Sequence, residues 1–439
     1  MLDIKFVREH PEEVKKTIHR KNQESTKGTL VDQVLALDTE WRALKGKGDD
    51  LRAQRNKLSK EIADAFKKKQ KPEALLAQAK ELPQILEATE AKALALETQL
   101  QALLAQLPNT LHKDVPLGKS DKENKEIKQI GKPKKSTFEI KNHAELIEGL
   151  NQADFGASAK TSGNGFYYLQ NDIALLNQAL IHYAIDHMVK AGFTYVETPL
   201  MLRKEVIGKV ADLNDMNMQI YKIQDEDLYL IGTSEHSLIG RYIDTILSEK
   251  ALPLKHTSYS MCFRKEIGSH GIDQKGLYRT HQFNKVEMIV VCKPSESMKY
   301  FEQLKKITID IFKGLGIPIR ILAICSGDLG DLKHIQVDIE AWSPRKQEYF
   351  EVGSCSNLTG SQARKLKIRV DPGTGEKYAP HTLNNTAMAT SRALVAILEN
   401  YQQKDGSIKI PTALHKYMYG KKVIGKPVKT EKKTSKKKK

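Results

Sequence analysis

The sequence predicts a two-part protein: an all-α antiparallel coiled-coil arm, then an α+β domain built on an antiparallel sheet flanked by helices. Three observations support this prediction. Leucine recurs every seven residues near the N-terminus. Several later segments alternate apolar and polar residues, as strands do. These strand-like segments follow one another without a regular strand–helix–strand rhythm, which argues against a parallel sheet.

Composition bounds the class of protein. The chain has 439 residues, enough for two or three domains, and 40% of them are hydrophobic. No run approaches the roughly 20 apolar residues of a membrane span, and the N-terminus has no signal-peptide core, so we expect a cytoplasmic protein. The four cysteines are scattered without a C-x-x-C pair. This favours reduced, buried thiols, and no zinc is expected.

The net charge of +17 is uneven, because residues 421–439 hold ten Lys and one Glu and so carry +9 of it. This basic tail is predicted to be disordered. It is compatible with added affinity for RNA, with a solubilising role or with a nuclear address. The modest positive excess of the remaining chain is compatible with a polyanionic partner.

The arm is predicted over about residues 28–108, after a short helical segment at 1–27. Two heptad runs indicate two helices of about 40 residues, each roughly 60 Å long. The basic segment 66–74 separates them and forms the turn of a hairpin. Pro83 is expected to kink or break the second helix. The first run is Leu30, Leu37, Leu44, Leu51, Leu58 and Ala65, and the second is Leu75, Ala79, Leu82, Leu86, Ala93, Leu96, Leu100, Leu103 and Leu107.

Positive charge gathers at the tip of the arm: residues 52–71 contain eight Lys or Arg and two acids. A basic tip suits contact with a phosphate backbone. A solvated coiled coil that only dimerises is an equally good interpretation of the hairpin alone. We therefore assign residues 1–110 to an arm-bearing domain, 111–135 to a polar linker, 136–420 to the α+β domain and 421–439 to the tail.

The α+β domain contains one segment with unusual chemistry, residues 258–291. Its Gly-rich middle and strand-like ends predict a long hairpin. By strand alternation, Arg264 and Glu266 share one face, and the return strand places Arg279, His281, Phe283, Lys285 and Glu287 on one face. A ligand with phosphates, a flat ring and an ammonium group would satisfy these side chains. Surface ion pairs on an exposed hairpin are the alternative. Neither a Rossmann fingerprint nor a P-loop is present.

CFRKEIGSHG…GLYRTHQFNKVEM closely resembles motif 2 of the class II aminoacyl-tRNA synthetases, in the form found in seryl-tRNA synthetases. GTSEHSL (232–238) resembles that family's serine-binding loop, and FEVGSCSNLTGSQARKLKIR (350–369) its metal- and ATP-binding strand. HTLNNTAMATSRALVAILENYQ (381–402) resembles motif 3, and GFTYVETPL (192–200) motif 1, with Pro199 at the family's dimer interface. The T-S-E loop is similar to the corresponding loop in the archaeal and eukaryotic branch of the family.

The resemblance implies the ATP-binding roles. Arg264 would contact the α-phosphate and the serine carboxylate, and Arg392 would contact the γ-phosphate. Glu266 would hold the adenine end, Thr280 would meet adenine through its backbone, and Phe283 would stack on the ring.

Four further residues and a metal complete the implied ATP site. Glu351 and Ser354 would coordinate Mg²⁺, an oxygen-seeking cation, with Val352 and Gly353 between them on the same ATP-binding strand. Arg264, Arg392 and Glu351 are thus the expected catalytic residues. Gly353 stands where the family often has serine, and Asn385 is a second departure with no predicted effect.

Serine recognition and tRNA binding follow from the same resemblance. Thr233 and Glu235 would take the serine ammonium, and Glu287 and Thr386 would read the hydroxyl. The expected activity is ATP-dependent formation of seryl-adenylate and transfer to the 3′ end of tRNA(Ser), and of tRNA(Sec) where that tRNA is present, by a homodimer. The tRNA-binding candidates are the basic residues of the arm tip: Arg52, Arg55, Lys57, Lys60, Lys67, Lys68, Lys69 and Lys71.

Two other functions are weighed against this one. A catalytically inactive paralogue would only bind tRNA or a partner, but the motif residues are intact. A ligase that loads an amino acid onto a carrier protein would lack the long arm, which this chain has.

Overall fold

The structure is a computed structural model that describes residues 1–133, 135–211, 219–266 and 276–425. It divides into two compact units, Met1–Thr110 and Leu111–Lys439. Two predicted features, the Gly-rich centre of the hairpin (267–275) and most of the basic tail (426–439), lie outside the described residues.

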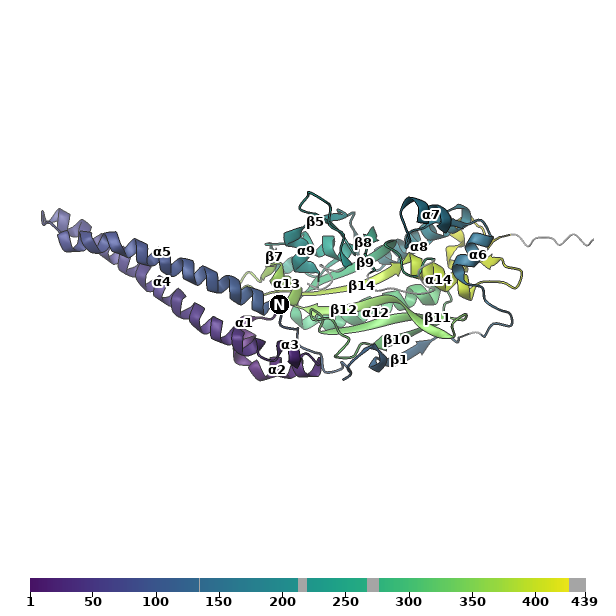
Figure 1. Ribbon diagram of the computed structural model, residues 1–439, viewed down its shortest axis with the longest axis horizontal. Coiled ribbons are helices and arrows are strands. Elements are labelled where there is room, and N and C mark those ends of the chain that lie inside the picture. The colour runs from purple at the N-terminus through teal and green to yellow at the C-terminus, as the bar shows by residue number, and fades with distance from the viewer. Residues whose placement is uncertain (134, 212–218, 267–275, 426–439) are drawn as a thin grey trace, which may run out of the picture. The chain divides into compact units, whose positions relative to one another are not determined.

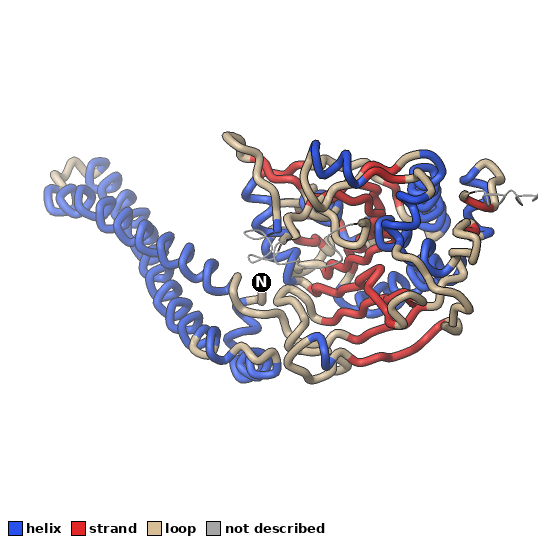
Figure 2. Tube along the Cα trace, turned by 45° about the vertical axis from the view of Figure 1, so that its right-hand side comes forward, coloured by secondary structure: helices blue, strands red, loops and turns tan. Residues whose placement is uncertain are grey.

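The N-terminal unit is all helix, as predicted (Figures 1 and 2). Its two long helices, α4 (Leu30–Lys67) and α5 (Glu73–Leu104), pack along each other. Three short helices precede them: α1 (Ile4–Glu9), α2 (Pro11–Arg20) and α3 (Glu24–Lys27). A cluster of buried side chains joins α1 and α2 to the start of α4 and the end of α5, with Val7, Ile18, Val34 and Leu104 among its members.

The heptad positions form the seam of the hairpin. Leu51 and Leu58 on α4 and Leu86 and Leu100 on α5 are buried, while their neighbours are exposed. The expected break at Pro83 is wrong, because α5 runs through it without interruption. Pro83 lies on the exposed side of the helix, where water can satisfy the carbonyl that the proline leaves without a donor.

The C-terminal unit is built on one eight-stranded sheet in the order β1-β10-β11-β12-β14-β9-β8-β4 (Figure 1). All neighbouring strands are antiparallel except β4 and β8, which matches the predicted α+β class. The strands are β1 (Lys125–Ile130), β4 (Thr194–Tyr195), β8 (Leu254–Phe263), β9 (Gln282–Cys292), β10 (Ile319–Ala323), β11 (Ile335–Ser343), β12 (Glu348–Thr359) and β14 (His381–Ala389).

Helices α8 (Asn171–Lys190), α12 (Ser297–Gly314) and α14 (Thr390–Asn400) pack on this sheet. The main core lies between them and the sheet, and alternate residues of β9 (Val286, Met288, Val290) point into it. The residues between these, such as Lys285 and Glu287, therefore face the opposite side. No described helix is long and apolar enough to cross a membrane.

Smaller elements surround the sheet. The helices are α6 (His143–Gly149), α7 (Phe155–Thr161), α9 (Lys204–Val210), α11 (Ser234–Gly240) and α13 (Ser361–Lys365), with 3₁₀ turns at Asp121–Glu123, Glu249–Ala251, Pro294–Glu296 and Thr412–Met418. The paired short strands are β2 (Ala153–Asp154) with β3 (Tyr168–Leu169), β5 (Met201–Arg203) with β6 (Leu228–Leu230), β7 (Ile246–Ser248) with β13 (Arg369–Asp371), and β15 (Ile408–Lys409) with β16 (Val423–Ile424).

The prediction of a linker over residues 111–135 is partly wrong. Its residues Lys125–Ile130 form β1, the edge strand of the large sheet, paired with β10. Five of its six side chains are exposed, so the strand is held by backbone hydrogen bonds rather than by an apolar face. A polar edge strand shows no alternation of apolar residues, which is why the sequence pattern did not reveal it.

Candidate active site

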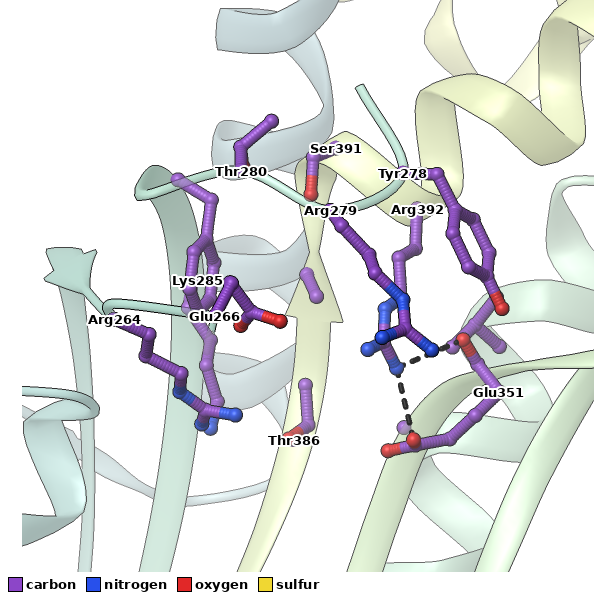
Figure 3. A pocket seen from close by; sticks show the side chains of 14 residues that line it. Arg264, Glu266, Tyr278, Arg279, Thr280, Lys285, Glu351, Thr386, Ser391 and Arg392 are labelled. Carbon is purple, nitrogen blue, oxygen red and sulfur yellow. Dashed lines mark hydrogen bonds and ion pairs between the residues drawn. The ribbon is translucent and has the colours of Figure 1, made fainter. Parts of the chain in front are cut away.

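An open pocket lies over β9, β12 and β14, at the start of α14 (Figure 3). It contains about 540 Å³ of empty space, its mouth included, a size common for small-molecule sites. Of the nine residues expected to bind ATP, eight line it and Ser354 does not. The lining residues are Arg264, Glu266, Tyr278, Arg279, Thr280, Phe283, Lys285, Glu351, Val352, Gly353, Thr386, Ala389, Ser391 and Arg392.

Arg392 and Glu351 are paired on one side of this pocket, and Arg264 lies on the other side (Figure 3). Nη1 of Arg392 lies 2.9 Å from Oε2 of Glu351 and donates to the Glu351 backbone oxygen at 3.2 Å. Burial alone would raise the pKa of the Glu351 carboxyl, but the charge and hydrogen bond of Arg392 outweigh burial, so this pKa is lowered. The carboxylate is therefore ionised and available to a cation.

A second carboxyl, which the sequence did not suggest, lies beside Glu351. Asp338 on β11 is paired with Ser354 on β12, and its side chain is hydrogen-bonded to Ser354 and Gln336. Burial, and then the negative charge of Glu351, raise the pKa of Asp338 to about 7. Two carboxyl groups and a hydroxyl at one place form an oxygen-rich donor set, which suits Mg²⁺.

Arg264 lies just beyond the end of β8. Its Nε donates to the backbone oxygen of Gly232 at 3.2 Å, and its Cζ lies 5.4 Å from the centre of the Phe283 ring. Glu266 adopts a left-handed backbone conformation (φ 47°), so the chain turns there rather than continuing the strand. Arg264 thus joins the pocket to the loop that precedes Thr233.

Thr233, Lys285 and Glu287 form a buried cluster below the pocket. Glu287 is fully buried, and its Oε2 accepts from Thr233 Oγ1 at 3.1 Å and contacts Lys285 Nζ at 2.5 Å. Lys285 Nζ also donates to Thr233 Oγ1 at 3.1 Å. Across the described residues, Oε1 of Glu287 has no hydrogen-bond partner, so the cluster offers one free acceptor.

Glu235 lies next to this cluster and is held by two amides. Nε2 of Gln362 donates to its Oε1 at 2.9 Å, and Nδ2 of Asn384 donates to its Oε2 at 2.7 Å. Burial, and then the charge of Glu287, raise the pKa of Glu235 to about 7. A bound ammonium group would favour the ionised form of this carboxyl.

The two departures from the family pattern meet at Thr308 of α12. Thr308 Oγ1 donates to the backbone oxygen of Thr386 at 2.9 Å and accepts from Nδ2 of Asn385 at 3.0 Å. A Cβ added at Gly353 would lie 3.1 Å from that same Thr386 oxygen and 3.3 Å from Cγ2 of Thr308. The absence of a side chain at Gly353 therefore makes room for the Thr308–Thr386 contact.

One part of the predicted hairpin geometry is wrong. Because β9 begins at Gln282, the alternation does not extend to His281, which does not line the pocket. Its ring stacks on Phe166 at 5.3 Å, and its Nδ1 lies 2.5 Å from the hydroxyl of Tyr221. The sequence did not point to Tyr278, Gln362, Asn384 or Asp338, and it placed Lys285 on the ligand-facing side of the strand without a specific role. Only Lys285 carried a local signal, because it lies two residues before Glu287 on a strand.

The basic residues of the arm tip differ in their surroundings. Arg52 is engaged by Glu90 at 2.6 Å and by Asp49 at 2.7 Å. Lys68, Lys69 and Lys71, around the turn, are exposed. If the tip binds a polyanion, these three lysines are better placed than Arg52 to contact it.

Comparisons with known proteins agree with this geometry. Residues 1–111 match the family model described as seryl-tRNA synthetase N-terminal domain, and residues 220–401 match tRNA synthetase class II core domain (G, H, P, S and T). The chain is 46% identical over 423 residues to the serine–tRNA ligase of Methanocorpusculum labreanum, covering 96% of this chain and 99% of the relative. The chain belongs to the seryl-tRNA synthetase family.

Solved structures of the family superpose on the chain. Seryl-tRNA synthetase from Pyrococcus horikoshii, complexed with ATP, matches with a TM-score of 0.91 at 41% identity, covering 98% of this chain and all of that one. The cytoplasmic serine-tRNA ligase of Naegleria fowleri, in complex with AMP, matches with a TM-score of 0.86 at 32% identity, covering 97% and 99%. Both relatives hold an adenine nucleotide.

Proposed function

We propose that this chain activates serine with ATP to form seryl-adenylate and then transfers the seryl group to the 3′ end of tRNA(Ser), and of tRNA(Sec) where that tRNA is present. The observation that carries the proposal is the junction of the two parts of the site. A pocket with three arginines and two glutamates lies directly against the buried cluster of Thr233, Lys285 and Glu287. Lys285 belongs to both, and Thr386, which lines the pocket, is paired with Glu287 in the sheet. ATP in the first and serine in the second would bring the reacting groups together.

Adenylation needs positioning and charge stabilisation rather than a base. The serine carboxylate is already ionised and attacks the α-phosphorus, the bond to the β-phosphate oxygen breaks, and pyrophosphate leaves. Arg264 would stabilise charge at the α-phosphate and Arg392 at the γ-phosphate. Because Arg392 is paired with Glu351 in this structure, a contact between Arg392 and the γ-phosphate would exchange that carboxylate for phosphate oxygens.

The freed Glu351 carboxylate is a suitable magnesium ligand, together with Ser354. The donor set is made of hard oxygens, and the pKa of neighbouring Asp338 is raised by burial first and by the charge of Glu351 second. Mg²⁺, when bound, would supply positive charge that neutralises the phosphates. The adenine ring would lie against Phe283, near Glu266 and the backbone of Thr280.

Serine would be recognised by the buried cluster. Glu235 would take the ammonium group, with its carboxylate oriented by Gln362 and Asn384. The free Oε1 of Glu287 would accept a hydrogen bond from the serine hydroxyl, and Thr386 would also contact that hydroxyl. Alanine would leave that buried oxygen unpaired, which is costly and therefore gives selectivity.

The arm would hold tRNA through the phosphate backbone, with Lys68, Lys69 and Lys71 as the main contacts. A ribose hydroxyl of the tRNA 3′ end would then attack the adenylate carbonyl and release AMP. We also propose a homodimer located in the cytoplasm, where translation uses charged tRNA. Pro199, the expected dimer contact, accepts a hydrogen bond from Ser237 of α11 at 2.7 Å, so a dimer interface there would lie close to the serine site.

The test has two parts. Serine-dependent ATP–pyrophosphate exchange should occur, and no other amino acid should support comparable exchange; exchange with none would refute the adenylation activity. A variant in which residues 45–97 are replaced by a short Gly/Ser turn keeps the apolar cluster of α1, α2 and the near ends of the arm. It should retain exchange and lose tRNA charging. Full charging by this variant would refute the role of the arm.

A further inference from the structure

Lys285 is the residue that joins the ATP pocket to the buried acidic cluster. It lines the pocket, yet the residue is only 7% exposed. Its Nζ contacts Glu287 Oε2 at 2.5 Å and Thr233 Oγ1 at 3.1 Å. A lysine buried this deeply is uncommon unless it is paired, and both of its partners belong to the proposed serine site.

The hydrogen bonds of this cluster can be accounted for atom by atom. Thr233 has one hydroxyl proton, which it donates to Oε2 of Glu287. Its oxygen accepts from Lys285 Nζ and from the backbone N–H of Glu235. Oε2 of Glu287 thus has two partners, whereas Oε1 of the same buried carboxylate has none among the described residues.

This asymmetry has a consequence for substrate recognition. Lys285 and Thr233 together hold one carboxylate oxygen and leave the other as an acceptor. The strand geometry fixes the direction of the side chain, because Glu287 is paired with Ser258 on β8 and with Thr386 on β14. A substrate hydroxyl is the kind of donor that this free oxygen requires.

We propose that Lys285 is a positioning and specificity-determining residue, which pairs with Glu287 and Thr233 so that Oε1 of Glu287 is presented to the serine hydroxyl. This inference rests on the proposed function. Lys285 acts through Glu287 and forms no bond to the hydroxyl itself. It also supplies the positive charge that a fully buried carboxylate requires, beside a second acid, Glu235, which is partly buried.

The experiment compares serine and alanine at the same site. Four variants are made in the full chain: K285M, K285R, E287Q and the double variant K285M/E287Q. The serine KM and kcat come from pyrophosphate exchange, and the inhibition constant of alanine comes from the same assay. Alanine carries the ammonium and carboxylate groups but lacks the hydroxyl. K209M is the matched control, because Lys209 forms an ion pair with Glu205 at 2.7 Å outside the pocket.

K285M should raise the serine KM on the order of 100-fold, with a smaller change in kcat and an alanine inhibition constant within about threefold of the unmodified value. K285R should recover part of the loss, since it keeps the charge. Added to E287Q, K285M should change the serine KM by less than about threefold, because residues that act through one another are not additive. K209M should change neither constant.

Two results would overturn the inference while leaving the proposed function intact. One is an equal loss of serine and alanine binding in K285M, which indicates a general structural role. The other is a K285M effect that multiplies fully with that of E287Q. If K285M unfolds below the assay temperature, the double variant, which removes both charges, is compared with E287Q instead. Absence of serine-dependent exchange in the unmodified chain would refute the proposed function and this inference with it.

Discussion

Replacing Arg392 with alanine removes the cation at the far end of the nucleotide pocket. Nη1 of Arg392 lies 2.9 Å from Oε2 of Glu351. In the proposed complex it leaves that carboxylate and meets the γ-phosphate. The substitution should therefore affect ATP use far more than it affects folding.

The expected effect of this substitution on folding stability is smaller than its effect on ATP use. At 2.9 Å and an effective dielectric constant of about 20, the pair has a gross attraction of about 6 kcal/mol. Desolvation offsets most of this, and the side chains of Arg392 and Glu351 are 29% and 41% exposed, so we expect a loss of only about 1 kcal/mol in unfolding free energy. Losing a preorganised donor to developing charge costs about 3 kcal/mol, or roughly 100-fold in kcat/KM for ATP.

The assay is pyrophosphate exchange at varied ATP, together with thermal unfolding. Arg345→Ala is the matched control, because Arg345 forms a similar pair with Glu399 at 3.1 Å, its side chain is 23% exposed, and it does not line this pocket. The control should show unchanged ATP kinetics and a stability loss at least as large, because the side chain of Glu399 is only 2% exposed. Unchanged ATP kinetics in Arg392→Ala, or equal kinetic losses in both variants, would refute the phosphate role.

Three further predictions concern serine and tRNA. Because burial and the charge of Glu287 raise the pKa of Glu235 to about 7, and an ammonium group binds the ionised form, the serine KM should rise as pH falls below about 7 while the ATP KM changes little; a flat serine KM between about pH 6 and 8 would contradict this. Gly353→Ala places a Cβ 3.1 Å from the Thr386 oxygen and should raise the serine KM about tenfold, an overpacking effect of about 1.4 kcal/mol; an unchanged KM would show that Thr386 can shift freely. Lys68→Glu and Lys69→Glu should each raise the tRNA KM and weaken its salt dependence without changing pyrophosphate exchange. The control Lys92→Glu, on the exposed surface of α5, should leave the tRNA KM unchanged. Equal effects at all three positions would argue against a localised contact at the tip.

Much of the fold could be predicted because its signals are local. The heptads of α4 and α5 identify the residues that become the buried seam, and alternation along β9 correctly places Lys285 and Glu287 on one face. The predictions from sequence are wrong where that local signal ends. The alternation could not show that β9 starts at Gln282, so His281 was placed in the pocket, and the polar residues of β1 carried no strand signal.

The sequence by itself determined the helical arm, the α+β class, the motif residues and, through their resemblance, the chemistry to expect. Only the tertiary structure decided how those residues are partnered. Gln362 and Asn384 reach Glu235 from more than a hundred residues away, and Thr308 links Gly353, Asn385 and Thr386 across a helix and two strands. The physical reason is that a motif specifies which groups are present, whereas hydrogen bonds, burial and charge in a folded site depend on segments that only the fold brings together.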